Sequence, residues 1–146
     1  MTGTEHYVAD LFDAVDALDA AAFAERFAED GTFRFGNAPP VVGRRQIADS
    51  VAGFFSTISG LKHEIVGVWS GAWEGGAVTS VETTVTYLRK DATVTDAIPV
   101  TSTLRMRGEL IADFRVFADI SPVFATAGGG GRAEAAGAKV VVGSVP

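Results

Sequence analysis

The spacing of apolar residues changes near residue 60, and this change constrains the fold more than any other feature of the sequence. Before it, three segments carry apolar residues at the 3.6-residue period of helices that bury one face. After it, Val- and Thr-rich stretches alternate with the two-residue period of strands. Helices followed by a long antiparallel meander indicate an α+β fold. We therefore predict three N-terminal helices packed on a strongly curved antiparallel sheet, with a hollow between them.

The predicted elements can be placed along the chain. The first helix carries its apolar stripe at Val8, Leu11, Phe12, Val15 and Leu18. A short second helix follows, which Asp19 can cap, and a third ends near Gly60. Thr32 to Phe35 is a small extra strand, and four long strands are expected at about 61–69, 78–88, 93–106 and 110–118. Pro99 predicts a bulge or an edge position in the third of these.

Composition excludes several classes of partner. The chain has 146 residues and a formal charge of −6, and its Lys and Arg residues cluster only in pairs, which argues against nucleic acid. It lacks a signal peptide and any apolar run long enough to span a bilayer, so we expect a cytoplasmic protein with no membrane partner. It also lacks Cys, and His6 and His63 lie on different elements, so no metal site is predicted.

The domain is predicted to end near residue 125. Residues 126–146 are rich in Gly and Ala and cannot bury enough surface to order themselves, so we predict a flexible tail. Lys139 to Val142 is a short β-prone patch, which either frays or adds to a sheet edge. Deletion of residues 127–146 should leave the fold intact.

The order of five local motifs resembles a known superfamily. They are FAEDGTFRFG (27–36), PPVVGRRQI (39–47), LKHEIVGVW (61–69), VETTVTYLRKD (81–91) and GELIADFRVFADISPVFA (108–125). Over residues 5–125 the chain resembles the nuclear transport factor 2-like superfamily, specifically its SnoaL-like branch. The resemblance implies a homodimer, which we expect to pack through the outer face of the sheet. It does not imply one function, because the superfamily includes ketosteroid isomerases, polyketide cyclases and limonene epoxide hydrolases.

The catalytic residues of the ketosteroid isomerases are missing at the matching positions. The general-base Asp falls at Phe35, and the oxyanion-hole Tyr falls near Leu11. The second oxyanion acid falls near Thr101 or Thr103. Phe35 cannot accept a proton and Leu11 cannot donate a hydrogen bond, so we predict no ketosteroid isomerase activity.

The water-activating residues of the epoxide hydrolases also look incomplete. Those enzymes have an Asp directly after the strand Arg, whereas here Val116 follows Arg115. Their middle strand carries an Arg and an Asp, whereas the corresponding stretch here offers only Glu82. Arg115 is expected to pair with a carboxylate across the sheet or at a subunit contact.

His63 and Glu82 are the candidate catalytic residues. An imidazole can act as an acid or base near neutral pH, and a carboxylate in an apolar cavity can shuttle a proton. A two-residue turn at Glu74-Gly75 or at Gly75-Gly76 would place both side chains on one sheet face. The structural alternatives are a His63 that is hydrogen-bonded within the core or at a dimer surface, and a solvent-facing Glu82.

Four further residues are candidates for contact with a ligand: Tyr87, Trp69, Phe35 and Val116. The alternative for buried aromatics is that they only form the core. Two functions remain open. One is an acid/base enzyme that acts without a cofactor on a small apolar, polyketide- or terpenoid-like molecule, as a cyclase, isomerase or hydrolase. The other is a non-catalytic ligand-binding or dimerisation module of the same fold.

Overall fold

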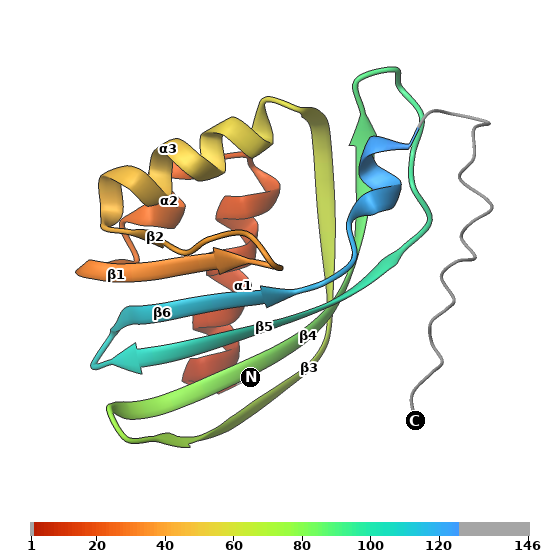
Figure 1. The fold of residues 1–146 in the computed structure, drawn as a ribbon. Helices are drawn as coiled ribbons and strands as arrows, with labels where there is room; N and C mark the ends of the chain where they lie inside the picture. The colour runs from red at the N-terminus through yellow and green to blue at the C-terminus, as the bar shows by residue number, and fades with distance from the viewer. Residues whose placement is uncertain (1, 126–146) are drawn as a thin grey trace.

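The computed structural model describes residues 2–125, and the predicted tail lies outside this range. Three helices precede most of the sheet, as predicted (Figure 1). The elements are α1 (Gly3–Asp16), α2 (Ala20–Ala24), β1 (Phe27–Phe35), β2 (Val41–Val42), α3 (Arg44–Phe55), β3 (Ile58–Trp73), β4 (Gly76–Arg89), β5 (Ile98–Arg107), β6 (Leu110–Phe117) and the 3-10 helix η1 (Ser121–Phe124). The α+β class is therefore confirmed.

The helices begin where the sequence provides caps. Thr2 accepts a hydrogen bond from the Glu5 N–H at 3.0 Å, and the Glu5 carboxylate accepts one from the Thr2 N–H at 2.9 Å. This capping box satisfies donors that the first turn of α1 leaves without partners. Asp19 caps α2 as predicted, because its Oδ1 accepts from the Ala22 N–H at 3.0 Å.

The sheet has six strands in the order β2-β1-β6-β5-β4-β3. Strands β3 to β6 form the predicted antiparallel meander, but β1 runs parallel to β6. Strand β1 also begins at Phe27, earlier than the predicted Thr32. Glu29-Asp30-Gly31 has the composition of a turn, yet here it forms an irregular stretch between the pairings of Phe27 and Thr32 with β6.

Strand β5 begins at Ile98, later than the predicted start at residue 93. It pairs with β4 from Ile98 onward, but with β6 only from Thr101 onward. Pro99 therefore lies where one side of β5 has no neighbouring strand. This confirms its predicted edge position, because proline cannot donate to a ladder.

The core lies between the concave face of the sheet and the three helices (Figure 1). At one end, the rings of Phe23, Phe27, Phe33 and Phe114 pack with centroids 5.2 to 6.3 Å apart. Most of these contacts are edge-on or tilted, as aromatic pairs prefer. Within residues 2–125, no helix is long and apolar enough to cross a membrane.

Candidate functional site

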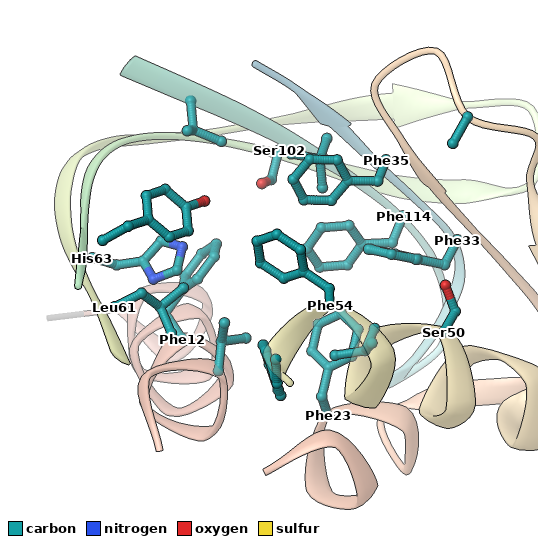
Figure 2. A pocket seen from close by; sticks show the side chains of 17 residues that line it. Phe12, Phe23, Phe33, Phe35, Ser50, Phe54, Leu61, His63, Ser102 and Phe114 are labelled. Carbon is teal, nitrogen blue, oxygen red and sulfur yellow. The ribbon is translucent and has the colours of Figure 1, made fainter. Parts of the chain in front are cut away.

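The helices and the sheet do not close completely on each other, and they leave a cavity of about 260 Å³. Its wall is mostly aromatic. Seven phenylalanines line it: Phe12, Phe23, Phe33, Phe35, Phe54, Phe55 and Phe114. Phe12 comes from α1, Phe54 and Phe55 come from α3, and the strands contribute the opposite side (Figure 2). Such a wall favours a largely apolar occupant.

One end of the cavity is polar because His63 on β3 meets Asp16, the last residue of α1. The His63 Nδ1 lies 2.6 Å from the Asp16 Oδ1. The backbone N–H of His63 also donates to this carboxylate, at 3.2 Å to Oδ1 and 3.1 Å to Oδ2. The side chain of His63 is 8% exposed and that of Asp16 is 17% exposed. The pair is therefore a nearly buried, charge-assisted contact between helix and sheet.

The hydrogen bond to Asp16 determines the tautomer and the orientation of the His63 imidazole. An ionised carboxylate only accepts hydrogen bonds, so Nδ1 of His63 carries the proton and donates it. Nε2 is then left for other partners. The ring also packs on Phe12, with centroids 4.5 Å apart. Together these contacts hold the imidazole in one orientation at the cavity wall (Figure 2).

Tyr87 adds a hydroxyl at the same end. It pairs with Leu61, two residues from His63 along β3, and is 3% exposed. Burial, together with the negative charge of Asp16, raises the pKa of Tyr87 to about 12. The phenol is therefore a neutral hydrogen-bond donor throughout the physiological range.

Two serines are the other hydroxyl groups in the wall. Ser102 lies on β5 and is 2% exposed, whereas Ser50 lies on α3 and is exposed to solvent. Within residues 2–125, no group of three or more His, Asp or Glu side chains is arranged to hold a metal ion.

The structure brings four of the six candidate residues to the cavity. His63, Tyr87, Phe35 and Val116 all line it. Trp69 does not, since it is 56% exposed and stacks over Gly67 on the outer face of the sheet. Its predicted ligand contact is therefore wrong for this cavity.

Glu82 requires a second correction. It is exposed on the outer face, where it pairs with Gly67 and Thr101, and it does not meet His63. The predicted two-residue turn at Glu74-Gly75 does form, since Trp73 pairs with Gly76. The same-face argument fails because of what happens farther along β3.

A β-bulge in β3 reverses the expected alternation. Ile65 pairs with Thr83 and Gly67 with Glu82, so Val66 has no partner of its own. One extra residue on one strand shifts every residue beyond it to the other face. His63 consequently pairs with the fully buried Val85 and faces the cavity. The same shift explains why Trp69 does not share a face with His63.

The sequence did not identify Asp16, which is the actual partner of His63. One signal was present: Asp16 lies four residues after Phe12, so a carboxylate continues the buried face of the first helix. A charge at such a position is unusual unless it is paired. The sequence alone contains nothing that places this helix end beside the strand of His63.

The positions matched to relatives are now located. Phe35 lines the cavity, while Leu11 is fully buried in the core. Thr101 and Thr103 flank Ser102, whose side chain faces inward. Arg115 pairs with Asp113, with Nε 2.7 Å from Oδ2. Both residues lie on β6, so an ion pair forms within one strand and not across the sheet as predicted.

Similarity to known proteins agrees with this architecture. Residues 8–114 match the sequence profile of the SnoaL-like domain. No protein of curated function matches the chain significantly in sequence.

Solved structures with low sequence identity share the fold. A hypothetical protein with a ketosteroid isomerase-like fold from Catenulispora acidiphila, in complex with trimethylamine, is 24% identical, with a TM-score of 0.63 over 77% of this chain and 88% of that chain. ActVI-ORFA from Streptomyces coelicolor is 20% identical, with a TM-score of 0.62 over 81% and 98% of the two chains. An LEH-like epoxide hydrolase from M. tuberculosis is 17% identical, with a TM-score of 0.62 over 82% and 84%. The profile match spans most of the domain, and these structures have the same α+β fold, so the chain belongs to the SnoaL-like domain family of the nuclear transport factor 2-like superfamily.

Proposed function

We propose that the protein binds a small, largely apolar molecule in the cavity and that His63, oriented by Asp16, transfers a proton to or from it. The observation that carries this proposal is the 2.6 Å contact between Nδ1 of His63 and Asp16 at the polar end of an aromatic cavity. A base held by a carboxylate in this way has one nitrogen committed and one available for chemistry.

The groups at this end have complementary roles. Nε2 of His63 takes a proton from the bound molecule, and Asp16 stabilises the positive charge that the imidazole then carries. Tyr87 donates a hydrogen bond to an oxygen on which negative charge develops, since its raised pKa keeps it protonated. Return of the proton from Nε2 to a second carbon gives an isomerisation. If the deprotonated carbon attacks a carbonyl group of the same molecule and the proton goes to the new alkoxide, the result is a cyclisation. For a hydrolysis, Nε2 takes the proton from a water molecule that attacks the ligand, and then gives it to the leaving group.

The size of the cavity limits the ligand. An apolar protein cavity of about 150 Å³ holds one benzene ring. The cavity here has a volume of about 260 Å³, which suits a molecule of one or two rings. A steroid with four fused rings would extend out of this volume. Polyketide- or terpenoid-like molecules of one or two rings fit both the volume and the apolar wall.

Hydrogen–deuterium exchange at carbon tests the proposal directly. The probe is 2-tetralone, a two-ring ketone with acidic protons next to its carbonyl group. In deuterated buffer, the wild-type protein should accelerate deuterium uptake at these carbons, measured by proton NMR. His63→Ala and Asp16→Asn should each slow the catalysed exchange by about 10²-fold or more, the usual contribution of a general base.

Glu82→Gln is the matched control, because Glu82 lies outside the cavity on the same sheet. It should exchange at the wild-type rate. Equal rates for the wild-type protein and His63→Ala would contradict the proposed catalysis. If 2-tetralone then still bound in the cavity, the alternative function as a non-catalytic binding module would be favoured.

A further inference from the structure

Ser102 is a polar residue on an otherwise apolar strand face. The inward positions of β5 are Ile98, Val100, Ser102 and Leu104. Across the sheet, Ser102 pairs with Val81 on one side and Val116 on the other. Neither side chain can hydrogen-bond with it, and the fold alone gives no reason for a hydroxyl at this position.

The Ser102 hydroxyl forms no hydrogen bond among residues 2–125, and the residue is 2% exposed. Its oxygen is not one of the fully enclosed atoms without a partner, which are the Tyr7 hydroxyl and the Arg26 Nε, because it opens on the cavity. The nearby Thr83 shows the usual solution, since its hydroxyl donates to the carbonyl oxygen of Val100 at 3.2 Å. Ser102 lines the cavity, and Figure 2 shows its oxygen turned into the space that Phe35 and Phe54 border. A buried hydroxyl that forms no hydrogen bond within the protein is available to a ligand.

Ser102 and His63 are separated along the sheet. His63 pairs with Val85 and Ser102 with Val81, four residues apart on β4. This corresponds to about 13 Å of backbone at the usual rise of a strand. Most of the other residues that line the cavity are apolar, and seven of them are phenylalanines. Apart from the exposed Ser50, the cavity thus has two separate hydrogen-bonding positions in a mostly apolar wall.

We infer that the ligand is a one- or two-ring molecule with oxygen substituents at two ends, one held by His63 and Tyr87 and the other by Ser102. Ser102 is then a specificity-determining residue that selects a hydroxyl or carbonyl group remote from the reacting carbon. This inference rests on the proposed function, because it concerns the ligand of the same cavity.

Two probes that differ by one hydroxyl group test it. 2-Naphthol has one oxygen, and 2,6-dihydroxynaphthalene has a second at the opposite end of the same ring system. Calorimetric titration of the wild-type protein should give about three- to tenfold tighter binding of the diol, the range expected for one neutral hydrogen bond. Ser102→Ala should abolish this preference without weakening the binding of 2-naphthol. Its melting temperature should match the wild type, since no hydrogen bond within the protein is lost.

Ser50→Ala is the matched control, because Ser50 also lines the cavity but is exposed. It should keep the preference for the diol. The inference is overturned if Ser102→Ala prefers the diol as strongly as the wild type does, or if the wild type shows no preference for the diol. Either result leaves the proton-transfer proposal intact. The reverse result, a preference that depends on Ser102 in a protein that exchanges no deuterium into 2-tetralone, supports the inference and removes the catalytic proposal. Failure of both probes to bind overturns ligand binding itself.

Discussion

The high pKa of Tyr87 predicts a loss of stability at alkaline pH that a single substitution should remove. In the unfolded chain a tyrosine ionises near its ordinary pKa of 10.0, whereas in the folded protein burial and Asp16 raise the pKa of Tyr87 to about 12. Ionisation above pH 10 therefore favours the unfolded chain. The stabilising effect of the neutral phenol is complete below pH 10 and is lost as the pH rises toward 12.

The magnitude follows from the two pKa values. One pKa unit corresponds to about 1.4 kcal/mol, so the difference between 10.0 and about 12 corresponds to about 3 kcal/mol when the loss is complete. About half of it, near 1.4 kcal/mol, should be lost between pH 9 and pH 11. Tyr87→Phe has no phenol to ionise, so its free energy of unfolding should fall by that much less over the same interval.

Urea unfolding at pH 9 and pH 11 measures this difference for the wild-type protein and for Tyr87→Phe. Absorbance titration of tyrosinate gives an independent reading, because the chain has only two tyrosines. Burial also raises the pKa of the other one, Tyr7, so Tyr7→Phe is needed to assign the two transitions. Equal alkaline losses in the wild type and in Tyr87→Phe would refute the reasoning. A Tyr87 transition near pH 10 would do the same.

Two further predictions concern packing and assembly. Gly31→Ala should destabilise the protein by about 1–3 kcal/mol in urea unfolding, because the new methyl group would lie 2.9 Å from the backbone oxygen of Ile111. The control is Gly53→Ala, on an open face of α3, which should be neutral or stabilising. Equal effects of the two substitutions on the free energy of unfolding would disprove the steric argument. We also propose that the protein is a homodimer that buries Trp69 and Phe117, each 56% exposed on the outer sheet face. Sedimentation should show a dimer at micromolar concentration and a monomer for Trp69→Glu, whereas a monomeric wild type would rule the dimer out.

The fold could be predicted from the sequence because its main signals are local. The helical spacing from Val8 to Val15 and the alternation after residue 60 each depend on which face of one element is buried. The cap at Asp19 and the edge position of Pro99 follow from the chemistry of single residues. The parallel pairing of β1 with β6 did not emerge, because it joins segments about eighty residues apart.

The candidate site was only partly predictable. It depends on which face of a strand each residue occupies, and on contacts between segments that are far apart in the sequence. The position of His63 in the cavity wall depends on Val66, whose bulge reverses the alternation of β3. The one local sign of that bulge is Gly67, since an isolated glycine inside a strand often accompanies a bulge. The predicted alternation did not take it into account, so Glu82 was assigned to the wrong face. Asp16 reaches His63 only after the end of α1 docks on β3. Tyr87 and Phe35 could be predicted as cavity residues because large aromatic side chains are usually buried, whichever strand register the sheet adopts.

Asp16 fastens α1 to β3 with the same oxygens that orient the imidazole. The carboxylate binds both the backbone N–H and the ring of His63, so its loss would loosen the helix as well as the base. Selection for a stable fold alone is therefore enough to retain an acid at this position during evolution. If a related protein lacked the proposed proton transfer, the contact between helix and strand would still favour keeping both residues. The presence of the pair in a relative would therefore be evidence about folding before it was evidence about catalysis. Ser102 forms no such hydrogen bond within the described part of the chain, so whether a relative keeps it would depend on the ligand instead.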